Sequence, residues 1–518
     1  MNVKNQHSIG IIGAGPTTVY FLCGIVNRKD VPKKIVVFEK HHELGKGNPF
    51  RKVNSMPDLL SNVTKKEVPA LNISFDAWSQ IKKKDNVLSG ESGVENVGSS
   101  CDAKAQTVIR RRALGDYFNF CFLRAVDDLR RKGVKVVINT GVEVCKITEA
   151  KRQFTVHATQ RAYTGFTCLV INTGTDLCET KHEAQTFPAY PPHIYASKNS
   201  RRFYIKGMSL TAIDAALSIA KNKGRFYSRA GRLNYQSDMD YKVVMQSRTG
   251  LFPNVWYNSD VVDYYREKLE QPTNIRVSNI ESFYRYRLLP LFKEELPETH
   301  RQIAGMSFSK ALGFLTQRES IGHPISKLKT ELLALSSKTK ESDWPAIMAA
   351  GVDYIQQSPL LLKEFLANYQ DIKPLLSASF ASIPSDSASK LIALYENGIL
   401  HVEQSHSVRK NETSHSRSIT IDAKGVLGKA DKLATLKKLI EFSDKDKTYA
   451  CDKALIDLSI SRSHELLRNG KSTGVFIGSA YATPWYINVP GLDSCASFAK
   501  KIAMNCMQNR QLEEAVGE

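Results

Sequence analysis

Residues His7–Glu39 read HSIGIIGAGPTTVYFLCGIVNRKDVPKKIVVFE, and this stretch decides the fold of the N-terminal part of the chain. The first apolar run, IGII, predicts a buried strand, which the glycines at positions 13 and 15 interrupt abruptly. An apolar segment of helical length follows, and the run IVVF predicts a second strand that ends in an acid. Strand, glycine turn, helix, strand and terminal acid are the order of a dinucleotide-binding βαβ unit.

Each part of this unit has a physical role in holding a dinucleotide. Gly13 permits the tight turn, Gly15 lets the backbone approach a pyrophosphate, and the helix points its first amides at that anion. Glu39 can accept hydrogen bonds from both ribose hydroxyls. Thr18 replaces the third glycine of the pattern, and a small β-branched residue still lets helix and strand pack. The glycine motif alone would also suit an ordinary loop, but the strands and the acid favour a nucleotide site. The predicted contacts are Gly13, Gly15, Pro16, Thr17 and Glu39.

A second unit of the same kind follows further along the chain. Residues Arg202–Lys206 predict a strand, the segment GMSLTAIDAAL predicts a turn and a helix, and Tyr241–Gln246 predict another strand. Ser247 and Arg248 stand where an acid ended the first unit. A hydroxyl and a guanidinium suit a 2′-phosphate, which a carboxylate would repel. The first unit is therefore predicted to bind FAD and the second NADPH.

The second turn departs from the glycine pattern at Ser209. Its hydroxymethyl group either crowds the pyrophosphate or donates a hydrogen bond to it, so a purely structural βαβ unit is the alternative. The contacts predicted for NADPH are Gly207, Ser209, Leu210, Thr211, Ser247 and Arg248.

Length and composition narrow the class of protein. At 518 residues the chain is too long for one core, so two or three domains are expected. No apolar run approaches the roughly 20 residues that span a bilayer. The N-terminal MNVKNQHS leads directly into the first strand, so we expect no membrane association and a cytoplasmic location. The nine cysteines include no CxxC pair, which argues against a disulfide framework or a zinc site.

The formal charge of +20 has two interpretations. It either serves a nucleic-acid surface or steers anions such as NADPH toward the protein. The basic residues are dispersed and are not interleaved with aromatic residues, so we favour steering and expect no nucleic-acid partner.

Motifs from nearly the whole chain resemble one family. They are GAGPTTVYFL, ELGKGNPF, RRALGDYF, VINTGT, GMSLTAIDAALSIA, SRTGLFP and DWPAIM. Together they resemble the FAD-NAD(P)-binding family of two-dinucleotide-binding-domain flavoproteins, which is related to N-hydroxylating flavin monooxygenases. The resemblance implies an α/β fold with two Rossmann-like domains and a mainly helical insertion or cap. The expected parts are 1–200 with 458–518 for FAD, 201–257 for the NADPH core, and 258–457 for a mainly helical cap or substrate region completing the second domain.

The resemblance also places further residues near the flavin. Lys46 and Gly47 lie in a turn expected to pass over it, with a plain surface loop as the alternative. Arg111 and Arg112, at the entrance of a helix expected within Ile109–Leu129, either contact the pyrophosphate or form a solvated charge run. The remaining candidates are Thr173, Gly174, Gly478 and Ser479, in glycine turns after strands, and Trp485, as an active-site wall or as core packing.

No Ser/His/Asp arrangement, metal cluster or carboxylate pair stands out in the sequence, which fits an enzyme whose flavin carries the chemistry. The resemblance implies an NADPH-dependent FAD monooxygenase that N-hydroxylates an amine or amino acid with molecular oxygen, through a C4a-hydroperoxyflavin. An NADPH:acceptor flavin reductase or oxidase is the first alternative, and a nucleotide-sensing binding protein is the second. Neither the substrate nor the oligomeric state follows from the sequence.

Overall fold

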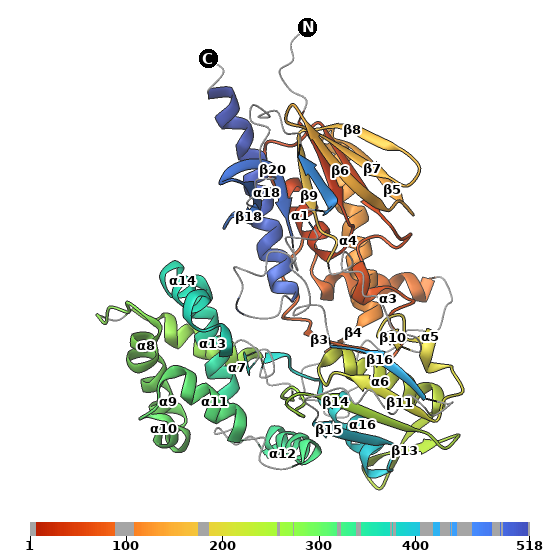
Figure 1. The fold of residues 1–518 in the computed structure, drawn as a ribbon, viewed down its shortest axis with the longest axis vertical. Coiled ribbons are helices and arrows are strands. Elements are labelled where there is room, and N and C mark those ends of the chain that lie inside the picture. Colours follow the sequence, from red (N-terminus) through yellow and green to blue (C-terminus); the bar gives the residue numbers. More distant parts are fainter. Residues whose placement is uncertain are drawn as a thin grey trace, which may run out of the picture.

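The chain divides into three parts in its computed structural model, two built on a parallel sheet and one built of helices (Figure 1). In Figure 1 the first sheet lies at the top, the second at the lower right and the helices at the lower left. The structure describes residues 7–88, 108–174, 186–255, 259–272, 274–318, 323–337, 343–372, 375–376, 380–404, 418–424, 436, 438–442, 458–478, 487 and 491–515.

The upper sheet joins strands from both ends of the chain. Its strands are β1 (Ser8–Ile12), β2 (Lys34–Glu39), β5 (Lys135–Thr140), β9 (Cys168–Ile171), β18 (Leu458–Ile460), β19 (Glu465–Arg468) and β20 (Lys471–Ile477). Their order is β18-β19-β20-β9-β1-β2-β5. The strands from β20 to β5 are parallel, and β19 and β18 extend the sheet in antiparallel fashion. The strand, turn, helix and strand predicted from residue 7 to residue 39 are confirmed.

The two-residue period of the central strands separates the two faces of this sheet. Ile11 and Val37 belong to a core shared with several helices, whereas Ile12 and Phe38 belong to a core on the opposite face. The helices that share the first core include α1 (Pro16–Val26), α4 (Arg111–Arg131) and α18 (Leu492–Ala515). A second sheet, in the order β17-β6-β7-β8, contributes to the opposite core. Its strands are β6 (Val144–Ala150), β7 (Gln153–Ala158), β8 (Ala162–Phe166) and β17 (Ile440–Phe442).

Two helix predictions in this part need correction. The helix expected within Ile109–Leu129 begins only at Arg111, because the residues before it form a strand that pairs with an earlier segment. The Ser61 hydroxyl fixes that strand by donating to the Ile109 carbonyl. The sequence also predicts a closing helix over Leu492–Cys506, and this helix runs on to Ala515. The remaining elements here are α2 (Gly47–Phe50), β3 (Leu60–Thr64), α3 (Phe75–Leu88) and β4 (Val108–Arg110).

The lower right part contains a five-stranded sheet in which every pairing is parallel. Its strands are β10 (Thr186–Pro188), β11 (Arg202–Lys206), β14 (Lys242–Ser247), β15 (Leu400–Gln404) and β16 (Ser418–Asp422), in the order β10-β16-β11-β14-β15. Helices α5 (His193–Ala196), α6 (Leu210–Lys223) and α16 (Ser385–Glu396) also belong to this part. The second strand–turn–helix–strand unit is confirmed, and two strands from beyond residue 258 complete its sheet.

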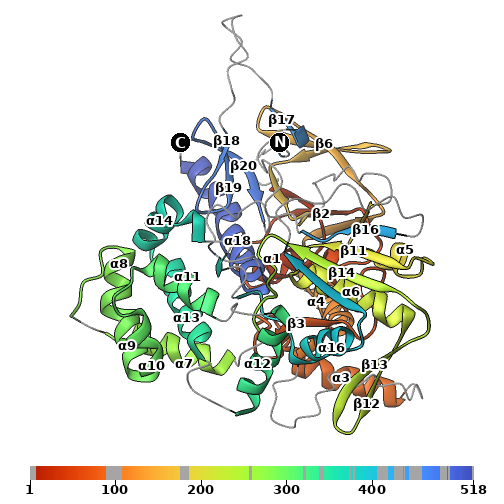
Figure 2. The same cartoon turned by 60° about the horizontal axis from the view of Figure 1, so that its bottom comes forward.

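The sequence predicts an exposed basic segment after α6, and most of its residues are exposed. It forms a two-stranded hairpin of β12 (Gly224–Arg229) and β13 (Arg232–Ser237). Figure 2 shows this hairpin projecting at the lower edge of the molecule. Phe226 and Tyr235 pack against each other on one of its faces, which explains why the hairpin folds despite its charge.

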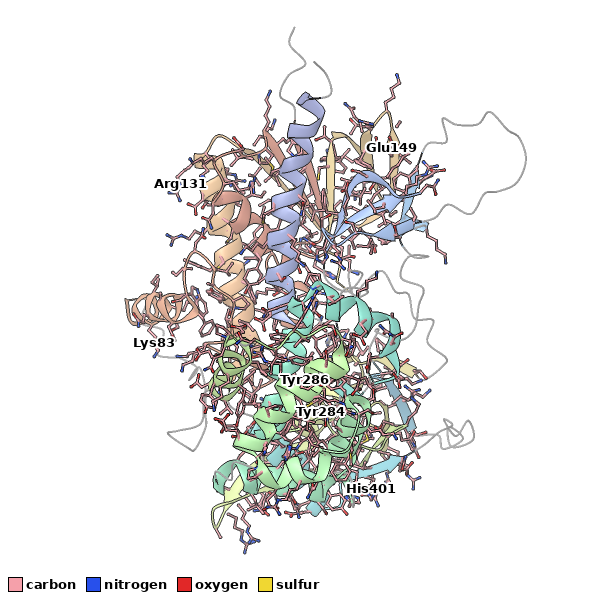
Figure 3. The ribbon with its side chains drawn as sticks, turned by 90° about the vertical axis from the view of Figure 1, so that its left-hand side faces the viewer. Lys83, Arg131, Glu149, Tyr284, Tyr286 and His401 are labelled. Atoms are coloured by element: carbon pink, nitrogen blue, oxygen red, sulfur yellow. The ribbon has the colours of Figure 1, made fainter. Side chains whose placement is uncertain are left out.

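The third part consists of helices around a core of its own. Trp344 is fully buried in this core. The helices are α7 (Ser259–Glu270), α8 (Ile280–Phe283), the π-helix η1 (Tyr284–Leu288), α9 (Leu289–Glu295), α10 (Pro297–Ile303), α11 (Phe308–Arg318), α13 (Trp344–Gln357), α14 (Pro359–Asn368) and the 3₁₀ turn η3 (Gln370–Ile372). Helix α12 (Pro324–Ser337) instead packs in the core of the lower right part, through Ile325 and Leu328. Figure 3 shows Tyr284 and Tyr286 of the π-helix, of which Tyr284 is buried and Tyr286 is exposed.

None of the helices that the structure describes is long and apolar enough to cross a membrane. Among the same described residues, no cluster of histidines, cysteines and acids could hold a metal ion.

His464 is a buried titratable residue in the upper part, before β19. Its ring packs 4.4 Å from the ring of Phe498 on α18, and its Nδ1 is buried without a hydrogen-bond partner. Burial, with a smaller contribution from the nearby Lys501 charge, lowers the pKa of His464 from 6.5 to about 3. The folded protein therefore holds this ring neutral across a range in which the unfolded chain binds a proton.

The free energy of unfolding should depend on pH through this residue. Stability from neutral His464 is fully present above pH 6.5 and is lost as the pH falls from 6.5 toward 3. His464→Asn should flatten the dependence over that window, by at most about 1.4 kcal/mol per pH unit. Urea unfolding at several pH values measures this slope, with exposed His193→Asn as the control. An unchanged slope in His464→Asn would contradict the assignment.

Candidate functional site

The first glycine turn lies between the end of β1 and the start of α1, at the centre of the upper sheet. Gly13 has a φ of +91°, and a side chain there would place Cβ 2.6 Å from the Asn172 carbonyl oxygen. Gly15 is the N-cap of α1, and a Cβ there would lie 3.2 Å from Cα of Gly47. Pro16 follows at the first helical position, where its missing N–H costs nothing. The backbone therefore permits the close approach that a pyrophosphate needs.

Thr18 holds this turn through a buried hydrogen-bond network that sequence reasoning missed. Its hydroxyl donates to the Gly13 carbonyl at 2.6 Å and accepts from Asn172 Nδ2 at 3.0 Å. The backbone N–H of Asn172 donates to the Ile12 carbonyl at 2.7 Å. The threonine in place of the third glycine thus ties the end of β9 to the turn after β1. The position of Asn172 directly after an apolar strand was the signal that could have revealed it.

Glu39 lies at the end of β2, beside the first turn. Its two carboxylate oxygens accept separate backbone hydrogen bonds, from Ala14 at 2.8 Å and from His41 at 3.0 Å. Each oxygen can accept a second hydrogen bond, so the acid remains able to bind a ribose diol. The Ala14 bond fixes the carboxylate next to the turn that would hold the pyrophosphate.

Lys46 and Gly47 lie in a loop that packs on the same turn. The Gly45 amide donates to the Ala14 carbonyl at 2.7 Å, and Gly47 faces Gly15. The Lys46 ammonium pairs with Asp116 at 2.9 Å and with Glu43 at 3.1 Å. Burial lowers the pKa of Lys46, but these two partners outweigh it and raise the pKa overall. Lys46 therefore anchors the loop onto α4 in a charged state.

The C-terminal edge of β9 and β20 carries unsatisfied polar atoms. Asn172 Oδ1 and Thr173 Oγ1 are both buried without a hydrogen-bond partner. Asn172 Oδ1 lies where a side chain at Gly478 would project, so only glycine fits there. Gly174 has a φ of +65° and open space around its Cα. The predicted residues Ser479 and Trp485 lie outside the described part of the chain.

Helices α1 and α18 begin at the same end of the site. Thr17 lies beside the thiol of Cys495, and Gly24 meets Ala503 eight residues further along α18. The two helices are therefore parallel, and the positive ends of both dipoles lie beside the glycine turn. Burial and the charge of Asp353 on α13 raise the pKa of Asp493, so the helical part lies close to the start of α18.

Glu67 is a second acid near this end that sequence reasoning missed. One of its oxygens accepts from the amide of Thr64 at 2.8 Å and from its hydroxyl at 3.0 Å. Burial raises the pKa of Glu67 to about 7, since those hydrogen bonds only partly offset it. The proximity of Asp493 adds to the rise.

The second glycine turn repeats the first in atomic detail. Gly207 has a φ of +136°, and a Cβ there would lie 2.5 Å from the Ala423 carbonyl oxygen. Its amide donates to the Gln246 carbonyl at 2.8 Å, as the Gly13 amide donates to Phe38 at 2.8 Å. Ser209 is the N-cap of α6 with φ −91°, which any residue adopts, and its side chain is exposed. Serine at this position therefore causes no backbone strain. Leu210 and Thr211 form the first turn of α6.

The strand register places Ser247 at the position that Glu39 occupies in the first unit. Gln246 pairs with Lys206 as Phe38 pairs with Ile12, so Ser247 follows as Glu39 does. The Ser247 hydroxyl accepts from the Gly250 amide at 2.9 Å.

Arg248 follows Ser247 with an exposed side chain. Its main-chain carbonyl is bound by Gln404 at 3.1 Å, while no carboxylate of the described residues forms an ion pair with its guanidinium. The position and its free charge fit the 2′-phosphate of NADPH.

The other two predicted arginines are bound by protein groups. Arg111 forms an ion pair with Asp214 of α6 at 2.7 Å, and its Nε donates to the Leu60 carbonyl at 3.0 Å. Arg112 Nε donates to the Ser55 carbonyl at 2.8 Å. A solvated charge run was the alternative for these two arginines. Arg111 does not fit it, because its side chain is buried and paired with Asp214.

Thr18→Val should destabilise the protein without changing its shape. It removes the hydroxyl that bonds both Gly13 and Asn172. The buried side-chain amide of Asn172 then lacks a partner, which lowers the free energy of unfolding by about 1–3 kcal/mol. Thr18→Ser keeps the hydroxyl and should cost less, so it is the matched control. Urea unfolding at pH 7 compares the two variants. If Thr18→Val and Thr18→Ser had equal free energies of unfolding, the hydrogen-bond network would contribute nothing to stability.

Comparison with known proteins supports the nucleotide-binding interpretation of the upper part. A protein-family profile described as FAD-NAD(P)-binding matches residues 10–176. The chain is 25% identical over 450 residues to the uncharacterised protein YdhS of Escherichia coli K12, covering 80% of this chain and 83% of that protein.

Two solved structures align with nearly the whole chain at low sequence identity. An ornithine N-hydroxylase of Kutzneria sp. 744 has a TM-score of 0.49 and 9% identity, over 98% of this chain and all of that one. A cadaverine monooxygenase of Erwinia amylovora has a TM-score of 0.48 and 10% identity, over 98% of this chain and 94% of that one. At these values neither likeness identifies a substrate. The family match concerns residues 10–176, which are similar to FAD-NAD(P)-binding proteins.

Proposed function

We propose that the protein is an FAD- and NADPH-dependent oxidoreductase, and specifically a monooxygenase that N-hydroxylates an amine or amino acid. The observation that carries the cofactor assignment is the repeated glycine turn with different residues at the end of the neighbouring strand. Glu39 suits the ribose of FAD, while Ser247 and Arg248 suit the phosphorylated ribose of NADPH.

The first site fits FAD by several independent features. Gly13 and Gly15 leave room for the pyrophosphate, and Glu39 is held at the turn. The unpartnered buried atoms of Asn172 and Thr173 provide polar contacts at the end of β9. In this proposal the sequence-based bounds are kept, with residues 1–200 and 458–518 for the FAD unit, 201–257 for the core of the NADPH unit, and 258–457 to complete that unit and form a helical cap. Two segments differ from these bounds: residues 186–200 pack with the second sheet, and β17 packs in the upper part.

The residues of the chain would bind, orient and shield the cofactors. Bound flavin supplies the chemistry of accepting a hydride and activating oxygen. The parallel starts of α1 and α18 stabilise negative charge at the first site. Ile487 belongs to the core of the helical part, and its amide donates to Gln356 on α13 at 2.9 Å. This contact attaches the segment before α18 to the helices, which would exclude water from the reacting groups.

N-hydroxylation is the narrower part of the proposal. It is supported by motifs of the sequence that resemble flavoproteins related to N-hydroxylases, SRTGLFP and SLTAID above all. The alternative is an NADPH:acceptor reductase or oxidase, in which oxygen is not transferred to a substrate. Glu67, whose pKa burial raises to about 7, is a carboxyl near Asp493 of α18 that can exchange a proton near neutral pH.

Arg248→Ala should change the preference between NADPH and NADH. Loss of a charged hydrogen bond to the 2′-phosphate costs about 1.5–3 kcal/mol, so kcat/KM for NADPH should fall roughly ten- to hundredfold. The value for NADH should stay unchanged, because NADH has no 2′-phosphate. Arg229→Ala, an exposed arginine on the hairpin of the same unit, is the control. A parallel loss with both nucleotides would contradict the assignment of Arg248.

Product analysis decides between oxygen transfer and simple oxidation. Purified protein reconstituted with FAD is mixed with NADPH, oxygen and, separately, ornithine, lysine, cadaverine or an aromatic amine. The monooxygenase should form a hydroxylamine in proportion to the NADPH that it consumes. Hydrogen peroxide as the only product with every amine would favour the oxidase, and absence of NADPH oxidation would contradict both enzymes.

A further inference from the structure

Three side chains from the two nucleotide-binding units meet in a buried cluster at the junction of the units. Arg111, at the start of α4, donates to Asp214 on α6 at 2.7 Å and to the Tyr190 hydroxyl at 3.3 Å. The Tyr190 hydroxyl in turn donates to Asp214. The side chains of Arg111 and Asp214 are only 11% and 9% exposed.

The members of this cluster come from different cores. Helix α4 belongs to the core of the first unit, whereas α6 and Tyr190 belong to the core of the second. Figure 1 shows β3, β4 and β10 at this junction, between the upper sheet and the lower right sheet. Arg111 also binds the start of β3. Its Nε donates to the Leu60 carbonyl, and its backbone amide donates to the Leu59 carbonyl at 2.9 Å. Leu59 packs in the core of the second unit.

A single geometry satisfies all of these bonds. The planar guanidinium of Arg111 is held by the Leu60 carbonyl on the first unit, and its remaining donors face Asp214 and Tyr190 on the second. Rotation of α6 relative to α4 would leave a buried charge without its partner, which is strongly unfavourable. Burial raises the pKa of Asp214, and the charge of Arg111 and the hydroxyl of Tyr190 oppose that rise. The cluster therefore favours one angle between the units.

We propose that Arg111, Asp214 and Tyr190 are positioning residues that set the angle between the FAD unit and the NADPH unit. The inference rests on the proposed function, in which a hydride passes between cofactors bound to different units. Bound NADPH would supply a hydride, with its two electrons, from the nicotinamide C4–H bond, and bound flavin would accept it, so NADPH would become NADP⁺ and the flavin would be reduced. Such a transfer needs reacting atoms about 3–3.5 Å apart, and a misplacement of about 1 Å slows it on the order of a hundredfold.

The test separates positioning from folding by a choice of variants. Arg111→Met with Asp214→Leu removes both charges together and keeps the volume, so it avoids an unpaired buried ion. Tyr190→Phe removes one hydroxyl and retains the ion pair. The control is Lys221→Met, which removes a half-exposed ion pair between Lys221 of α6 and Asp58 before β3.

Two measurements are made on each variant. Anaerobic rapid mixing gives the rate of flavin reduction by NADPH, and dithionite gives the rate for a small reductant that needs no second unit. Dye pairs attached to α4 and α16 report the distance distribution between the units in protein without cofactors. The double variant should be reduced by NADPH at least tenfold more slowly, with the dithionite rate unchanged and a broader distance distribution. Tyr190→Phe should be slowed two- to fivefold, and Lys221→Met should match the parent protein.

Each outcome decides the proposal. Unchanged NADPH reduction in Tyr190→Phe and in the double variant, with an unchanged distance distribution, would overturn it. If the double variant does not fold, Tyr190→Phe decides alone, and a parent-like rate and distance overturn the proposal. If NADPH does not reduce the parent protein, the proposed function fails, and the distance distributions still show whether the cluster sets the angle.

Discussion

A close approach of two backbone segments at the edge of each parallel sheet is the constraint on which the rest of the structure depends. A Cβ at Gly13 would lie 2.6 Å from the Asn172 carbonyl oxygen, just after the neighbouring strand β9. A Cβ at Gly207 would lie 2.5 Å from the Ala423 carbonyl oxygen, just after the neighbouring strand β16. Real Cβ atoms do not tolerate such contacts, so both positions require glycine in a left-handed or otherwise rare conformation. This approach lets a helix start directly over the strand end, and the helix start creates the anion site.

The two units meet the same constraint and differ in how they secure the turn. In the first unit Thr18 and Asn172 connect helix, turn and strand through buried hydrogen bonds. In the second unit the residue after the neighbouring strand is Ala423, which has no polar side chain for such a network. The two turns therefore depend on the same close approach but differ in the side chains that surround it.

Local patterns predicted the parts of this fold that depend on local physics. Apolar runs located the two strands of each strand–turn–helix–strand unit, and the glycines located both turns. Strands β10, β16, β18 and β19 were not predicted, because their short segments lack a distinct apolar pattern. The sequence could not indicate that β4 precedes α4, because the pairing of Ile109 depends on Ser61, far away in the chain. Nor could it show the partner of Arg111, since an arginine before a helix suits a phosphate and a carboxylate equally well. Long-range side-chain partners were the information that the pattern lacked.

The buried ion pair between Arg111 and Asp214 is better explained by geometry than by stability. Desolvating two charges costs several kcal/mol per ion in proteins, and apolar side chains of similar volume often stabilise as well or better. What an apolar contact lacks is direction, because it allows neighbouring helices to slide and rotate with little change in energy. The guanidinium fork and the Tyr190 hydroxyl impose direction on the contact between α4 and α6. Such a contact is expected where two rigid units must present their ligands to each other at a fixed distance.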